Sequence, residues 1–231
     1  MKKSDLPIKE YGIKMVSKDQ QIDFIELYSE FPELTRIQIK WLEEAEIFAE
    51  TKMEKNDLHG IGHVHRVIKN IVRLVKSEGG DPFILLFSAW LHDIGRKTEK
   101  FSTERNHAIN SADLTRNFVY ERNIGINEET LEKIIECIES HSFSSGRAQE
   151  SLEAKILSDA DKLDALGSIG IYRAGCFQHE NGTGLSGLIN HFGEKLLILD
   201  QKMHTKTGKN LAVSHISFMK KFIENLLREL D

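Results

Sequence analysis

Residues Phe83–Leu91 read FILLFSAWL, and they form the longest apolar run in the chain. Apolar side chains cover this run all round, so we expect a helix without a solvated face, buried at the centre of the fold. Asp81 and Pro82 precede it and are typical of a helix start, as a capping carboxylate and a first-turn proline. The run is far too short to span a bilayer, which takes about 20 residues. The sequence therefore predicts a buried central helix.

Helical patterns continue on both sides of this run. Proline occurs only three times and never after residue 82, so later helices meet no proline. The clean alternation typical of strands is scarce. We expect an all-α fold with helices from near Asp19 up to Pro32, at Thr35–Lys55, Ile61–Ser77 and Ser102–Asn123, from near Asn127, and at Leu152–Gly170, Leu188–Met203 and Val213–Leu230, with loops at Ser142–Gly146 and Glu180–Gly187.

Composition excludes several classes of protein. The 231 residues carry a net charge of −5, with 40% hydrophobic and 29% charged residues, which is typical of a soluble globular protein. Binding to a nucleic-acid polymer usually needs a basic surface, so we do not expect it. The N-terminal MKKSDLPIKE lacks the apolar segment of a signal peptide, and Cys137 and Cys176 make no disulfide framework. We expect a cytoplasmic protein that binds no membrane.

A His-Asp pair ends the apolar run, at His92 and Asp93. Burying ionisable groups there is costly unless they are paired or bind a cation. Upstream, His59 and His63 are four residues apart, and Arg66 follows His63 by three. On a helix these spacings place side chains on one face. Taken singly, such histidines are most often surface or hydrogen-bonded residues.

The segment 158–165 reads SDADKLDA and is the third concentration of ionisable residues. Asp161 and Asp164 point the same way on a helix and repel each other unless a cation lies near them. The plainer interpretation is a solvated helix start or cap. Imidazole nitrogens combined with carboxylate oxygens favour Mn, Fe, Co, Ni or Zn over Ca or Mg alone.

Taken in order, these groups resemble the pattern H…HD…D of the HD superfamily of metal-dependent phosphohydrolases. LHGIGHVHRV (58–67) resembles the helix of the first ligand, and LLFSAWLHDIG (85–95) resembles the buried helix that leads into HD. SDADKLDALGSIG (158–170) resembles the closing Asp segment of the YedJ/YpgQ-like branch. The resemblance extends over roughly residues 56–231, and also includes HAINSA, HSFS and HFGEKLL at positions 107, 141 and 191.

The resemblance implies an HD-domain helical bundle over residues 56–231 that hydrolyses a bond at phosphorus. It also implies a divalent metal ion held by His63, His92, Asp93 and Asp161, with Asp93 among the catalytic residues. We expect residues 1–55 to be an N-terminal helical extension packed on this core, although they could instead cover the site or make a subunit contact.

The chain departs from the pattern of this branch at two positions. His59-Gly60 stands where the branch usually has His-Asp, so an acidic partner of the site is missing. His215 stands where Arg is frequent. Both departures weaken a transfer of substrate preference, and neither touches the four metal positions.

Arg66 and Arg96 are the first candidates for phosphate contacts, because a guanidinium binds phosphate through two hydrogen bonds. Lys97 and Lys162 are second candidates. The alternative for all four is a surface salt bridge. We predict that Arg66, Arg96, Lys162 and Asp164 are catalytic and that Lys97 binds substrate. Asp164 would orient a ligand or a water molecule, or else only cap or pair locally.

His107 and His141 leave three alternatives open. They bind a second metal ion, they bind the substrate or support the site from outside it, or they have no role there. We place both among the substrate-binding residues. The cofactor is expected to be Mn, Co, Ni, Fe, Mg or Zn, with one site expected and a second site as the open alternative.

The favoured function is a metal-dependent phosphohydrolase acting on a nucleotide, with the pyrophosphate bond of a nucleoside triphosphate as its target. The alternatives within enzymes are a phosphomonoesterase and a phosphodiesterase. A metal-retaining ligand-binding module and a purely structural helical protein are the rivals of other classes. The expected partner is a small phosphorylated molecule, and the sequence permits a homodimer without requiring one.

Overall fold

The computed structural model describes residues 24–96, 106–142 and 146–230, and every regular element within them is a helix, which confirms the all-α prediction. The chain divides into two compact units, Met1–Glu33 and Leu34–Asp231. The first unit contains α1 (Phe24–Ser29), in which the rings of Phe24 and Tyr28 lie 6.2 Å apart. The extension predicted for residues 1–55 thus includes the first unit together with helix α2 of the second.

Helix α4 (Pro82–Leu91) lies at the centre of the second unit, and all of its residues are buried. The Asp81 side chain accepts hydrogen bonds from the amides of Phe83 and Ile84, at 2.8 and 3.2 Å. The predicted central helix and its cap are therefore confirmed. The helices packed against it are α2 (Arg36–Lys52), α3 (Ile61–Glu78), α6 (His107–Glu121), α7 (Glu128–Ser140) and α8 (Leu152–Asp164).

Polar caps start several of these helices. Thr35 and Gln38 form a capping box at the start of α2, as the position of Thr35 predicted. Asn127 caps α7 and Asn106 caps α6. The helix predicted over Ser102–Asn123 corresponds to α6, and its predicted start at Ser102 lies outside the described residues.

The single helix predicted over Leu152–Gly170 is wrong. The chain forms α8 up to Asp164 and then α9 (Gly167–Glu180). Gly167 has a φ of +67°, a left-handed conformation that ends a helix and favours glycine. Two helices therefore meet at a bend beside the carboxylates of segment 158–165.

The next two elements also differ from the prediction. The expected loop Glu180–Gly187 shrinks to the few residues between α9 and α10 (Gly184–Glu194). The expected helix Leu188–Met203 is interrupted at Lys195, whose ψ of −59° combines with a φ of −131°, and it continues as the 3₁₀ helix η4 (Leu196–Lys202). Gly184, Ser186 and Gly187 thus lie in the first turn of α10, where the hydrogen bonds of the helix outweigh their weak helix propensity.

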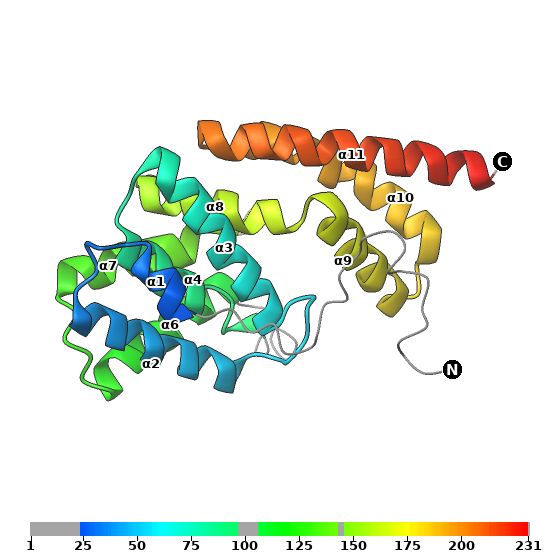
Figure 1. The fold of residues 1–231 in the computed structure, drawn as a ribbon. Helices are drawn as coiled ribbons and strands as arrows, with labels where there is room; N and C mark the ends of the chain where they lie inside the picture. The colour runs from blue at the N-terminus through cyan, green and yellow to red at the C-terminus, as the bar shows by residue number, and fades with distance from the viewer. Residues whose placement is uncertain (1–23, 97–105, 143–145, 231) are drawn as a thin grey trace, which may run out of the picture. The chain divides into compact units, whose positions relative to one another are not determined.

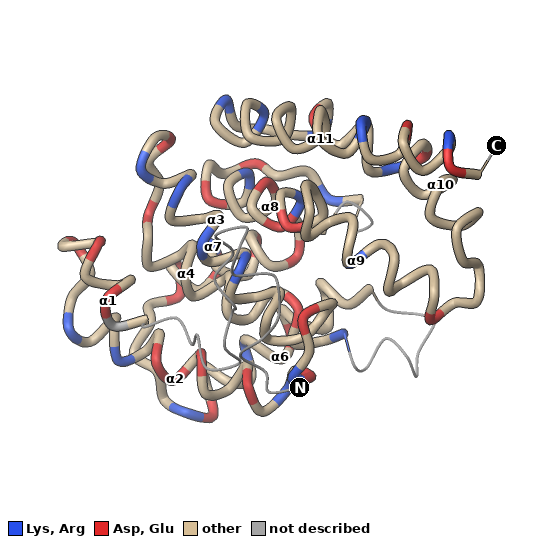
Figure 2. The backbone as a smooth tube through the Cα atoms, turned by 45° about the vertical axis from the view of Figure 1, so that its right-hand side comes forward, with Lys and Arg blue, Asp and Glu red and all other residues tan. Residues whose placement is uncertain are grey.

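Helix α11 (Lys206–Leu230) ends the second unit and runs along α8, α9 and η4 (Figure 1). It starts earlier than the predicted Val213. Basic and acidic residues are interspersed along α2 and α11 rather than separated into long stretches of one sign (Figure 2). Within the described part of the chain, no helix has both the length and the apolar character needed to cross a membrane.

Candidate metal centre

Three helices that pack on one another bring the predicted ligands together. His63 lies in the first turn of α3, His92 and Asp93 follow the last residue of α4, and Asp161 lies in the last turn of α8. His63, His92 and Asp93 are 0–1% exposed. The buried helix α4 therefore delivers two ionisable side chains into the interior, where they need a counter-charge.

The first cluster centres on the Nε2 atom of His63. This atom lies 3.3 Å from Nε2 of His92, 3.3 Å from Oδ1 of Asp161 and 3.5 Å from Oδ2 of Asp93. The Nδ1 atom of His92 lies 2.7 Å from the carbonyl oxygen of Ala89, which can only accept. The proton of neutral His92 is therefore on Nδ1, and its Nε2 lone pair faces His63.

The second cluster uses the other oxygen of Asp93. Its Oδ1 lies 3.5 Å from Nε2 of His141 and 3.6 Å from Nε2 of His107. His141 Nδ1 donates to the carbonyl oxygen of Ile138 at 2.6 Å, which leaves the Nε2 lone pair directed at Asp93. Asp93 Oδ1 and His141 Nε2 are buried and have no hydrogen-bond partner among the described residues.

These two clusters fit metal ions. When His63 is neutral and its proton is on Nδ1, toward Asp164, the lone pairs of His63, His92 and Asp93 face one another at 3.3–3.7 Å and repel, and a shared cation removes that repulsion. The ligand atoms of His63, His92 and Asp93 lie within 4.8 Å of one another, and so do those of Asp93, His107 and His141. The arrangement can hold one metal ion in each group, with Asp93 shared.

Electrostatics keeps His92 and Asp93 in the protonation states that bind a metal. Burial lowers the pKa of His92 to about 4, so this imidazole is neutral at pH 7. Burial by itself would raise the pKa of Asp93, but Arg96 and the surrounding histidines hold it well below its usual range. Neutral imidazole and ionised carboxylate are the forms that bind metals. Burial by itself would lower the pKa of His63, but hydrogen bonds to Asp161 and Asp164 raise it, so a metal ion at Nε2 would have to displace a proton there.

Asp164 contacts the ring nitrogen of His63 that points away from the cluster. Its Oδ2 lies 2.6 Å from His63 Nδ1, which makes Nε2 of His63 the nitrogen that faces the cluster. Arg66 donates to both oxygens of Asp164, at 2.6 and 3.0 Å, and Arg173 donates to Oδ2 at 2.6 Å. Arg66, predicted to contact phosphate, is thus directed at Asp164.

Arg96 and a cavity mark the open side of the centre. The Arg96 Nε donates to Asp93 Oδ2 at 2.5 Å. Both residues line a cavity of about 570 Å³, within the usual size of a small-molecule site. Apolar groups of Leu58 and Phe177 also line this cavity. Lys97, the predicted substrate contact next to Arg96, lies outside the described residues.

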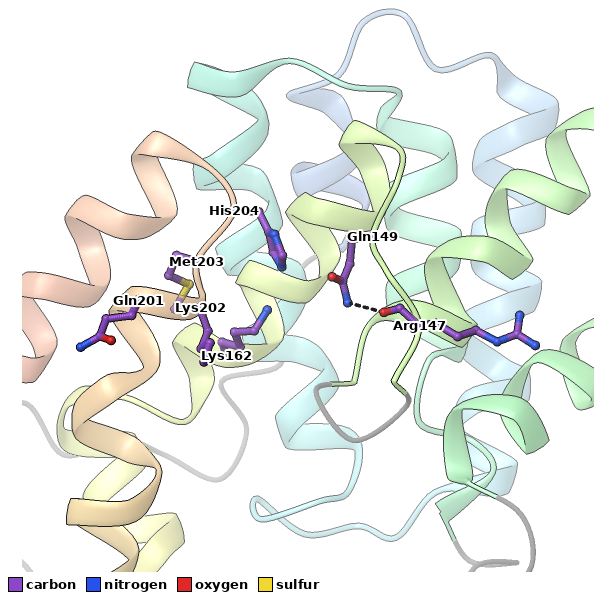
Figure 3. Close-up of a pocket in the computed structure, with 7 residues that line it drawn as sticks. All are labelled: Arg147, Gln149, Lys162, Gln201, Lys202, Met203 and His204. Atoms are coloured by element: carbon purple, nitrogen blue, oxygen red, sulfur yellow. Dashed lines mark hydrogen bonds between the residues drawn. The ribbon is translucent and has the colours of Figure 1, made fainter.

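Lys162 lies in a different cavity, of about 320 Å³ (Figure 3). Its Nζ donates to Oγ of Ser158 at 2.6 Å, and the Ser158 hydroxyl in turn donates to the carbonyl oxygen of His141 at 2.8 Å. In Figure 3 the side chain of Arg147 runs away from Lys162. Lys162 therefore braces the backbone of His141 in this structure, while its predicted catalytic role stays a prediction.

Two features of the centre were missed in the sequence. Arg173 lies on α9, where no pattern distinguished it from a surface arginine, and it contacts Asp164 because α9 turns back at Gly167. The expectation that His59 and His63 share a helix face is wrong, because α3 begins at Ile61. A close backbone approach explains Gly60: a Cβ there would lie 2.1 Å from the carbonyl oxygen of Glu54.

Comparisons with known proteins find similar sequences and similar folds. Residues 60–166 match the family model described as HD domain. The chain is 30% identical to the uncharacterized protein YpgQ of Bacillus subtilis over 182 residues, which cover 74% of this chain and 84% of that protein.

Solved structures give the same result. The crystal structure of Bacillus subtilis YpgQ in complex with ADP matches with a TM-score of 0.68 and 28% identity, over 84% of this chain and 96% of that one. An HD-superfamily hydrolase from Bacillus thuringiensis matches with a TM-score of 0.65 and 29% identity, over 84% of this chain and 98% of that one.

Proposed function

Since the chain belongs to the HD superfamily of hydrolases, we propose that it is a metal-dependent phosphohydrolase acting on a nucleotide, with the pyrophosphate bond of a nucleoside triphosphate as the favoured target. The observation that carries this proposal is Asp93. Its two oxygens face two separate groups of imidazole nitrogens at one wall of a cavity large enough for a nucleotide.

His63, His92, Asp93 and Asp161 would hold the first metal ion, and Asp93, His107 and His141 a second one. Such ions, when bound, lower the pKa of a water molecule and polarise a phosphoryl oxygen. The mixed nitrogen and oxygen ligands favour Mn, Fe, Co or Ni, with Zn and Mg as further candidates.

The protein's own groups then bind and orient the substrate. Arg96 is anchored on Asp93 and lines the cavity, so it places positive charge beside a phosphate bound there. Phe177 is 44% exposed in the same cavity and offers an aromatic face to a nucleobase. A nucleotide combines a base, a sugar and a phosphate chain, so it fits a cavity lined by both an aromatic ring and a guanidinium group. The ADP bound to the similar YpgQ supports a nucleotide ligand.

The test removes metal with a chelator and restores Mn, Co, Ni, Fe, Mg or Zn singly. Each form receives nucleoside mono- and triphosphates, cyclic nucleotides and a generic phosphodiester, and pyrophosphate and phosphate release are measured separately. His92→Ala/Asp93→Ala is the blank, and Lys133→Ala is the matched control, because its ion pair with Glu129 is exposed.

We expect metal-dependent pyrophosphate release that the blank abolishes and Lys133→Ala retains. Phosphate release alone would favour a phosphomonoesterase, and opening of a cyclic nucleotide would favour a phosphodiesterase. Tight metal binding without turnover of any substrate would contradict the proposal and favour a ligand-binding module.

A further inference from the structure

The guanidinium of Arg173 joins the metal centre to the cavity beside it. Arg173 on α9 donates through Nη1 to Oδ2 of Asp164 at 2.6 Å and to the carbonyl oxygen of the same residue at 3.2 Å. Its Nη2 lies 3.3 Å from Nδ1 of His59. Its side chain is 13% exposed. A single planar group therefore contacts both the carboxylate behind His63 and a histidine of the cavity wall.

This contact decides which nitrogen of His59 carries the proton. An arginine can only donate, so Nδ1 of His59 must accept, and the proton of the neutral ring lies on Nε2. Burial, followed by the positive charges of Arg96 and Arg173, lowers the pKa of His59 to about 4. At pH 7 the ring is thus neutral, with one N–H that Arg173 does not use.

The main chain around His59 is held tightly, so the ring has a defined place. The amides of Leu58 and His59 donate to the side-chain oxygen of Asn56, at 3.1 and 3.2 Å. Ile61 N–H donates to the carbonyl oxygen of Glu54 at 2.9 Å. The absence of a side chain at Gly60 permits this close fold. A donor on such a segment is preorganised.

His59 also lines the cavity beside the metal centre. It lines this cavity together with Asp93 and Arg96, and its ring stands edge-on to Phe177, with centroids 6.3 Å apart. Its position between the cationic groups and an exposed aromatic ring matches the junction of a phosphate chain with the rest of a nucleotide. The positive charges of Arg96 and Arg173 nearby favour a phosphate oxygen as the acceptor of the His59 N–H.

We propose that Arg173 is a positioning residue that holds His59 with its Nε2–H available to a phosphate oxygen of the substrate, and that His59 thereby contributes to substrate binding. The choice of phosphate rests on the proposed function. The tautomer and the role of Arg173 in setting it rest only on the contacts described above.

The first test measures the tautomer directly. Nitrogen-15 spectra of the histidine rings in wild-type protein are expected to show His59 protonated on Nε2. In Arg173→Lys the lysine retains a positive charge near Asp164 but lacks the second donor arm, so His59 is expected to become a mixture of tautomers. A wild-type His59 protonated on Nδ1, or a spectrum unchanged in Arg173→Lys, would overturn the proposal.

The second test changes His59 itself and separates its role in binding from its role in the structure. The amide nitrogen of Gln reaches the place of Nε2, whereas that of Asn reaches only the place of Nδ1. We expect His59→Gln to retain the wild-type affinity for ADP in the presence of Mn and His59→Asn to weaken it by about tenfold or more, the worth of one hydrogen bond to a charged group. For hydrolysis, the change is expected in KM rather than in kcat.

These readouts are independent of turnover. If the protein binds ADP in this manner but hydrolyses no phosphate compound, the proposed function fails and the role of His59 stands. If hydrolysis is observed while His59→Asn and His59→Gln bind ADP as tightly as wild type, the role of His59 is refuted and the hydrolase stands. Metal content, measured in every variant, checks that the centre itself is intact.

Discussion

Asp164→Asn is the change that most directly tests how the metal centre is supported. In the structure this carboxylate binds His63 Nδ1 at 2.6 Å, Arg66 through two hydrogen bonds and Arg173 through one. Asparagine has nearly the same shape but no charge, and it offers one oxygen where the carboxylate offers two. Both guanidinium groups would then lack their anion, and His63 would lose its acceptor or face an N–H group.

Two magnitudes follow. Losing the supporting partner of a metal-binding histidine typically lowers metal affinity by about 10- to 100-fold. Breaking a buried ion pair by neutralising one member costs roughly 3–5 kcal/mol of unfolding free energy. Because Asp164 is 3% exposed, solvent screens this loss little. A domain with stability of about 5–15 kcal/mol would remain folded in most of that range.

Calorimetric titration with Mn measures the first effect, and urea unfolding of the metal-free protein measures the second. Glu129→Gln is the matched control, because its ion pair with Lys133 is exposed, and both quantities should stay near wild type. If folded Asp164→Asn binds Mn with wild-type affinity, Asp164 does not orient His63 for a metal, and the reasoning is wrong.

Three further changes test separate parts of the structure. His141→Ala removes a ligand of the second cluster while leaving Asp93 in the first, so native mass spectrometry should find one bound metal ion instead of two; two retained ions would contradict this assignment. Gly95→Ala places a Cβ 2.7 Å from the carbonyl oxygen of His107. We therefore expect the free energy of unfolding, measured with urea, to fall by about 1–3 kcal/mol, and we expect the second metal ion to be lost. Burial and neighbouring carboxylates raise the pKa of Glu46 from 4.5 to about 7. The folded state therefore favours protonated Glu46, and its carboxylate destabilises the fold as pH rises from 4.5 to 7. Glu46→Gln should raise the free energy of unfolding by about 1 kcal/mol above pH 7 and leave it unchanged near pH 4. An equal effect at both pH values would show that the charge of the Glu46 carboxylate is not the cause.

Some helix boundaries could be predicted from the local sequence, and others could not. Thr35, Asp81 and Asn127 were predictable starts, since a capping side chain bonds to amides two or three residues later. The break at Gly167 was not, because glycine is tolerated inside helices and its positive φ depends on how α9 packs. The same bend brings Arg173 to Asp164, so one missed boundary also concealed one residue of the site.

The sequence by itself determined that α4 is central and that an ionisable pair ends it, because an apolar run without a solvated face must be buried and His92-Asp93 follows it directly. The order of His63, His92, Asp93 and Asp161 also identified the family. Only the tertiary structure decided how these groups are used. Two oxygens of one Asp93 face different histidines, and Arg173 reaches a histidine 114 residues away. Such contacts depend on the packing of whole helices, since spacing along one helix relates only residues a few positions apart.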